Sequence, residues 1–153
     1  MSETAAVLFD TNILIDYLNG VAKASHEIRR SHNPAISVIT WIEVMTGAAD
    51  EDEESVLRAF LSNFLCLPIT REVAERAAMN RRQKKIKLPD AIILATAEVA
   101  TRQLVTRNVK DFPAGMRGVR VPYSKGRFVQ GANVRSLHET KRNDQRPHSG
   151  LLR

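Results

Sequence analysis

The chain has 153 residues, of which 43% are hydrophobic and 26% are charged, a composition typical of a globular protein with one domain. Its single cysteine, Cys66, excludes a disulfide framework within the chain, so we expect a reducing compartment and a small buried hydrophobic residue at this position. No apolar run is long enough for a membrane span and Met1–Thr4 lacks basic residues, so we expect a cytoplasmic protein without a membrane segment or signal peptide.

The net charge of +6 suggests contact with nucleic acid, but the charge is unevenly distributed. Residues 125–153 carry seven Lys or Arg and two Asp or Glu, so they account for +5 of the total. The segment 124–153 is also polar and lacks periodicity, and we predict a flexible or loosely docked basic tail after a domain formed by residues 1–123. This tail could assist RNA binding or be a disordered extension.

The first third of the chain alternates short apolar segments with helical patterns. The predicted order is strand 5–9, helix 13–18, helix 22–30, strand 35–39 and helix 40–46. Thr11 or Asn12 could cap the first of these helices. Thr40 and Glu43 stand at the spacing of a capping box, which predicts that the third helix begins there.

The rest of the chain continues this alternation. The predicted order is helix 51–64, strand 65–69, helix 71–84, helix 89–101, strand 103–106 and strand 119–121, with a loop over 108–112. Pro68 favours an edge position for the third strand, and Pro89 suits the first turn of the last helix. In helix 71–84 we expect Val73, Ala77 and Ala78 to face inward. The pattern predicts an α/β sandwich with a mostly parallel sheet, in which ligands bind beyond the carboxyl ends of the strands.

Three acidic residues lie in the most apolar stretches of the chain. Asp10 follows the first strand, Glu43 lies in the third helix, and Asp90 lies in the first turn of the last helix. A carboxylate at the edge of a core costs several kcal/mol unless something pairs with it. Few basic residues occur in these segments, so the pattern indicates a divalent cation as the partner.

Each acid also has a purely structural interpretation. Asp10 could cap a helix, Glu43 could complete the capping box, and Asp90 could stabilise a helix dipole. Asp111 could be a turn residue, and we expect Asp16 to be solvated on the outer part of its helix. These interpretations explain the acids singly, but they do not explain why acids recur on the most buried elements.

The chemistry of the candidate ligands favours Mg²⁺ or Mn²⁺. Hard divalent ions take carboxylate oxygens, and Mg²⁺ usually keeps several waters. The histidines, His26, His32, His138 and His148, form no zinc-ligand spacing with a cysteine. A metal held by carboxylates can activate water and neutralise charge on a phosphate, which is nuclease chemistry.

A basic segment precedes Asp90 directly. Residues 71–87 carry seven Lys or Arg against two Glu, and they could either hold RNA phosphates or form a solvated helix face. The candidate RNA-binding residues are Arg81, Arg82, Lys84, Lys85 and Lys87. Trp41 lies beside Glu43 and is expected in the core, with base stacking as the alternative.

Four segments in order, 6–12, 37–43, 88–97 and 104–112, resemble a PIN domain. The resemblance covers roughly residues 5–122 and is greatest to the VapC-type ribonuclease toxins of bacterial toxin–antitoxin pairs, including the DNA-bound FitB-like branch. It implies a PIN-like three-layer α/β sandwich whose central, mostly parallel sheet is flanked by helices.

The resemblance also implies roles for single residues. The implied catalytic acids are Asp10, Glu43, Asp90 and Asp111, with Asp10 and Asp90 as metal ligands and Asn12, Thr11 and Asn108 as orienting residues. Many family members have an acid where this chain has Asn108, so the neutral residue leaves Asp111 to compensate and leaves open whether one or two metals bind.

The activity implied is Mg²⁺- or Mn²⁺-dependent endoribonuclease cleavage by activated water. The implied partners are the RNA substrate, a second copy of the chain, and a VapB-like antitoxin that inserts a segment into the acidic groove and alone contacts DNA. Two other interpretations stay open. One is a weakly active or inactive PIN module serving mainly in an antitoxin-bound, DNA-binding regulatory complex. The other is a phosphate-handling α/β domain, such as a response receiver or a phosphatase.

Overall fold

The computed structural model describes residues 6–113 and 115–124, and it contains one sheet of five parallel strands. The strands are β1 (Val7–Phe9), β2 (Ala35–Ser37), β3 (Leu65–Leu67), β4 (Gln103–Val105) and β5 (Val119–Arg120). Their spatial order is β3-β2-β1-β4-β5, so β1 is central and β3 is an edge strand. In β1, Leu8 pairs with Ala35 on one side and with Leu104 on the other. The predicted parallel sheet and its β3 edge are confirmed.

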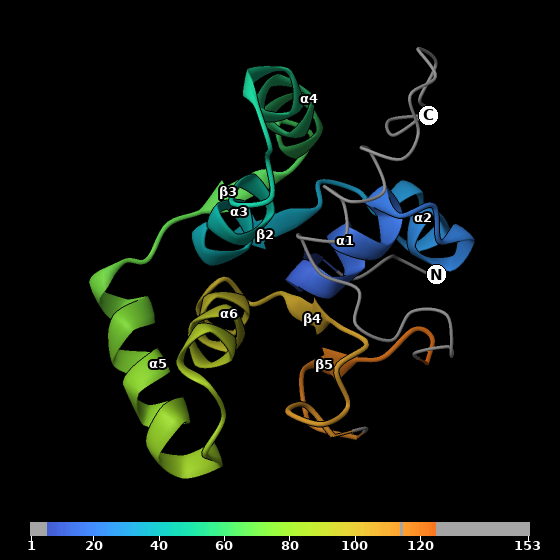
Figure 1. Cartoon of the computed structure of the whole chain (residues 1–153). Helices are drawn as coiled ribbons and strands as arrows, with labels where there is room; N and C mark the ends of the chain where they lie inside the picture. Colours follow the sequence, from blue (N-terminus) through green and yellow to red (C-terminus); the bar gives the residue numbers. More distant parts are fainter. Residues whose placement is uncertain (1–5, 114, 125–153) are drawn as a thin grey trace.

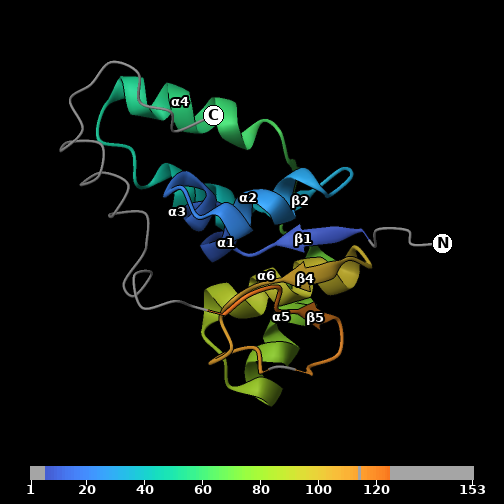
Figure 2. The ribbon, with the colours of Figure 1, turned by 90° about the vertical axis from the view of Figure 1, so that its right-hand side faces the viewer.

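Helices cover both faces of this sheet (Figures 1 and 2). They are α1 (Thr11–Leu18), α2 (Ala22–Arg29), α3 (Val38–Met45), α4 (Glu51–Leu61), α5 (Arg71–Lys84) and α6 (Leu88–Val99). Because side chains alternate along a strand, Val7 and Phe9 pack with α1 to α4, whereas Leu8 packs with α6. Helix α5 lies outermost and packs on α6 through Val73 and Ala77. The three-layer sandwich is therefore confirmed.

The third helix begins earlier than the sequence predicts. The side chain of Ser37 accepts a hydrogen bond of 3.0 Å from the backbone N–H of Ile39, so Ser37 is the N-cap of α3. The predicted capping box is wrong, because Thr40 and Glu43 both lie inside the helix. The apolar run that suggests a strand up to Ile39 belongs partly to the helix, since burial outweighs the β preference of branched residues.

Two further predictions about burial are wrong. Cys66 is exposed, because it lies on edge strand β3, where neighbouring Leu65 is also 44% exposed. Ala78 of α5 is exposed rather than inward-facing. Within the described part of the chain, no helix combines the length and the apolar character needed to cross a membrane. Residues 125–153, which make up nearly all of the predicted tail, lie outside the described residues.

Candidate active site

The carboxyl ends of β1 and β4 bring Asp10 and Thr106 together. Since Phe9 pairs with Val105, the residues that follow them emerge side by side. The Asp10 Oδ1 accepts a 2.8 Å bond from the backbone N–H of Thr11, and this contact caps α1. Its Oδ2 accepts a 2.7 Å bond from the Thr106 hydroxyl. Asp10 is thus the cap, which confirms its structural interpretation, and the predicted caps Thr11 and Asn12 are wrong because both lie inside α1.

Thr106 connects three parts of the site. Its hydroxyl oxygen accepts from the Asn12 side-chain amide at 3.2 Å and from the Asn108 backbone N–H at 3.0 Å, while the hydroxyl donates to Asp10. Asn12 also donates weakly to Asp10 Oδ2 at 3.3 Å, which fits its predicted orienting role. Sequence reasoning missed Thr106, although its place after β4 matches that of Asp10 after β1.

Glu43 reaches the site from α3. The Thr11 hydroxyl donates to Glu43 Oε1 at 2.5 Å and lies 2.9 Å from the Thr40 hydroxyl. This contact joins the start of α1 to the half-buried Glu43 of α3.

Asp111 and Asn108 form a small loop after β4. The Asn108 side-chain amide donates to Asp111 Oδ2 at 3.0 Å, and the Asp111 N–H donates to Asn108 Oδ1 at 3.2 Å. The hydrogen bond from Asn108 lowers the pKa of Asp111. The neutral Asn108 therefore favours an ionised Asp111.

The pKa values of Asp90 and Asp10 show that the four acids face one region. Burial raises the pKa of Asp90 to about 7, assisted by a hydrogen bond with Asp111 and by the charges of Asp10, Asp111 and Glu43. Burial also raises the pKa of Asp10 to about 6, with help from Glu43 and against the hydrogen bonds from Thr106 and Thr11. The charges of the other three predicted acids thus all act on Asp90.

The donor set fits a hard divalent cation. Asp10 is 3% exposed and forms no ion pair with a described residue, so its charge has no direct cationic partner in the protein. Among residues 6–113 and 115–124, no group of three or more His, Cys, Asp or Glu is arranged to hold a metal ion. Mg²⁺ commonly takes one or two carboxylates and keeps several waters, so it does not require a group of three protein ligands.

Asp16 is not solvated, which corrects the sequence prediction. It is 0% exposed and forms a bidentate ion pair with Arg107, with 2.5 Å to Nε and 2.9 Å to Nη2. The Tyr123 hydroxyl donates to Asp16 Oδ2 at 2.8 Å. The Arg107 backbone N–H also donates to Asn12 Oδ1 at 3.3 Å. This ion pair therefore ties α1 to the loop that carries Thr106 and Asn108.

The candidate RNA-binding residues differ in their contacts. Arg81 donates to the Ile86 carbonyl at 2.6 Å and so stabilises the connection between α5 and α6. Lys84 makes a long 3.5 Å contact with Asn80, and Lys85 is the left-handed C-cap of α5 with φ of 55°.

Lys87 is a basic candidate whose charge acts on one of the acids. Its charge helps to lower the pKa of Asp111, after the larger effect of the hydrogen bond from Asn108. Trp41 is half-buried against the core, as predicted, and the Arg58 guanidinium lies 5.5 Å from its ring centroid. That face of the ring is occupied by a cation.

The PIN domain family matches residues 7–114, a range that contains the four acids and Thr106. The chain belongs to the PIN domain family. The resemblance expected from the four segments is confirmed. An acidic group at the carboxyl edge of a parallel sheet is thus the candidate active site of this PIN domain.

Comparisons with individual proteins agree with this membership. Ribonuclease VapC10 of Mycobacterium tuberculosis is 36% identical over 115 residues, which cover 70% of this PIN domain chain and 86% of the relative. A chain of a toxin–antitoxin complex from Klebsiella pneumoniae is 47% identical with a TM-score of 0.74, and the match covers 78% of this chain and 100% of that one. FitAcB from Neisseria gonorrhoeae, 24% identical with a TM-score of 0.65 over 76% of this chain and 97% of its own, shares the fold.

Proposed function

We propose that this protein is the toxin of a type II toxin–antitoxin system and cleaves RNA as a metal-dependent endoribonuclease. The observation that carries the proposal is the group of mutually repelling carboxylates at the sheet edge, with pKa values raised for Asp10 and Asp90. The similarity to VapC10 and to a chain of the Klebsiella complex supports the same activity.

The four acids have different roles in the proposed reaction. Asp10 and Asp90 hold the cation, which is Mg²⁺ or Mn²⁺, and Glu43 and Asp111 complete the catalytic group. When bound, the cation supplies a water of lowered pKa and neutralises charge on the attacked phosphate. Thr106 keeps Asp10 Oδ2 oriented through its 2.7 Å bond.

The orienting residues act through this framework. Thr11 holds Glu43 through its hydroxyl, and Asn12 bridges Thr106 and the Arg107 backbone. Asn108 is neutral, and its amide stabilises the ionised form of Asp111.

The proposed partners follow from the same site. A VapB-like antitoxin inhibits the enzyme by placing a basic side chain against the acids, the toxin forms a homodimer, and DNA is contacted only through the antitoxin. An acidic site without a cation of its own is complementary to such a side chain.

Cleavage of total RNA by purified protein with Mg²⁺, with Mn²⁺ and with EDTA tests the activity. Asp10→Asn is the informative variant, because asparagine keeps the capping bond to Thr11 but removes the charge. Asp52→Asn, an exposed acid on α4, is the matched control. Discrete metal-dependent fragments from the wild type and the control, absent with Asp10→Asn, are expected.

One alternative keeps the fold but not the activity: a weakly active module that serves a DNA-binding complex with its antitoxin. The neutral Asn108, whose amide is engaged with Asp111, favours it. A folded, antitoxin-free sample that cleaves no RNA under any metal, yet binds its antitoxin, would support this alternative.

A further inference from the structure

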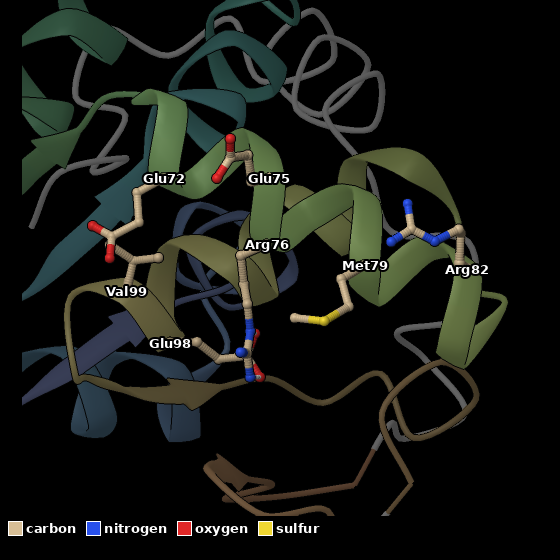
Figure 3. Close-up of a pocket in the computed structure, with 7 residues that line it drawn as sticks. All are labelled: Glu72, Glu75, Arg76, Met79, Arg82, Glu98 and Val99. Atoms are coloured by element: carbon tan, nitrogen blue, oxygen red, sulfur yellow. Dashed lines mark hydrogen bonds and ion pairs between the residues drawn. The ribbon is translucent and has the colours of Figure 1, made fainter.

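Two cavities lie against the helix pair α5–α6, and their linings differ in charge. The first, of about 560 Å³, is termed the glutamate pocket, and its lining is Glu72, Glu75, Arg76, Met79, Arg82, Glu98 and Val99 (Figure 3). The second, of about 710 Å³, is termed the basic pocket, and its charged lining is Arg76, Lys84, Arg102, Arg117 and Glu98. Three carboxylates face two guanidiniums in the first, whereas four cations face one carboxylate in the second.

The pair Arg76–Glu98 separates the two pockets and is neutral. Arg76 Nε and Nη2 lie 3.0 and 3.4 Å from the two oxygens of Glu98, and Asn80 donates to the same carboxylate at 2.8 Å. Figure 3 shows the ends of the two side chains meeting. The single acid of the basic pocket is therefore fully engaged.

Three cations of the basic pocket, Lys84, Arg102 and Arg117, form no ion pair with a described residue. Lys84 makes a 3.5 Å contact with Asn80, and its charge also acts on Glu98 at longer range. One nitrogen of Arg102 donates to the carbonyls of Val7 and Asn33, which leaves the rest of its guanidinium available. Arg117 is exposed and has no ion pair or side-chain hydrogen bond within the described part of the chain. The pocket is therefore suited to an anion.

The basic pocket extends along α6 from near the active site to the opposite edge of the sheet. Leu94 and Ala97 line it, and they fall on the same face of α6 as Asp90, at spacings of four and seven residues. One helical turn is about 5.4 Å, so the pocket begins roughly one turn beyond Asp90. Its far wall, residues 101–103 and 116–118, lies at the amino ends of β4 and β5, whereas Asp10 and Thr106 follow the carboxyl ends of β1 and β4.

We propose that the basic pocket binds backbone phosphates of the RNA strand on one side of the cleaved bond, an inference that rests on the proposed ribonuclease function. Four acids at the active site repel a polyanion, so affinity for RNA must come from cations elsewhere. Of the five RNA-binding candidates from the sequence, Lys84 lines the basic pocket, whereas Arg82 lines the glutamate pocket. It adds Arg102 and Arg117.

The test is RNA binding in EDTA, where cleavage is absent and binding is measured alone. Lys84→Gln with Arg117→Gln removes two cations that form no ion pair with a described residue, and Lys23→Gln with Arg29→Gln removes the same charge from two exposed sites on α2, outside the pocket. Fluorescence anisotropy of a labelled single-stranded RNA is followed across a salt series. The first double variant is expected to lose about tenfold in affinity at low salt, and the slope of log K against log salt falls by about 0.7 per phosphate contact.

The outcomes distinguish a failure of RNA binding in the basic pocket from a failure of the proposed ribonuclease activity. Equal losses in both double variants would overturn the proposal, because net charge alone would then explain binding. Displacement of RNA by polyglutamate at equal charge concentration would also overturn it, since the pocket would then take acidic polypeptide rather than RNA. Arg117→Gln alone guards against misfolding, because this exposed side chain has no described partner to lose. Wild-type protein that binds RNA through the pocket but cleaves none would leave this inference standing and remove the proposed activity.

Discussion

Two aspartates associated with helix α1 are both buried, but they have opposite surroundings. Asp10 is 3% exposed and receives only neutral hydrogen bonds, whereas Asp16 is 0% exposed and is held by Arg107 and Tyr123. Burial raises the pKa of Asp10 to about 6. A buried carboxylate with a full set of protein partners has a structural role, while one left without a cation marks the place where the protein expects one from outside.

The largest effect on stability is expected from removing the ion pair between Asp16 and Arg107. Arg107→Met leaves the Asp16 carboxylate buried without its cation, so the free energy of unfolding should fall by about 3–5 kcal/mol. Urea denaturation measures this change.

The control replaces the whole group by apolar residues. Asp16→Leu and Arg107→Met, with Tyr123→Phe because the tyrosine loses its acceptor, should recover most of the lost stability. A single Arg107→Met variant as stable as the wild type would show that the ion pair does not hold α1 to the loop after β4.

Removing the charge of Asp10, which has no cationic partner, should instead raise the free energy of unfolding. Asp10→Asn removes a charge whose burial is costly, so the free energy of unfolding should rise by about 1–2 kcal/mol near pH 7 while RNA cleavage is lost. Urea denaturation and the cleavage assay are run on the same sample, with the exposed Asp52→Asn as control. A variant that loses both activity and stability would mean that the Asp10 charge is already compensated within the protein.

This contrast also shows what the sequence could predict. Strand alternation and helical periodicity depend on local residue order, and they predicted the parallel sheet and the helices on both of its faces. Asp10 and Asp90 were identifiable because acids are rare in such apolar segments. The start of α3 was misplaced because Ser37 and Thr40 are both good caps, and only packing decides between them.

The partners of Asp16 could not be predicted, because they are distant in the chain. Arg107 and Tyr123 meet Asp16 across separations of 91 and 107 residues. A single sequence carries no signal for such a contact, so Asp16 was assigned to solvent. Cys66 was expected to be buried because it lies in an apolar segment, but Leu65 and Cys66 are both exposed, so both faces of edge strand β3 are partly uncovered there.

Metal should oppose the loss of stability that a rising pH causes at Asp10 and Asp90. The folded-state pKa values of Asp10 and Asp90 lie above the ordinary 3.8, so the metal-free protein should lose stability as the pH rises from about 4 to about 7. Mg²⁺ at about ten times its dissociation constant should add about 1.4 kcal/mol at about pH 8 and less at about pH 5, where protons compete. Thermal unfolding with Mg²⁺ and with EDTA measures both trends. Equal Mg²⁺ stabilisation at the two pH values would argue against these carboxylates as the ligands.

The smallest effect is expected from removing the Tyr123 hydroxyl, which donates to Asp16. Tyr123→Phe removes the 2.8 Å bond to Asp16 but leaves both contacts from Arg107, so the free energy of unfolding should fall by about 1 kcal/mol. RNA cleavage should be unchanged, because Arg107 still holds Asn12 through its backbone. Urea denaturation and the cleavage rate of this one variant are the measurements. A loss of cleavage at nearly full stability would show that Tyr123 helps to position the acids, and the division between a structural and a functional aspartate on α1 would then fail.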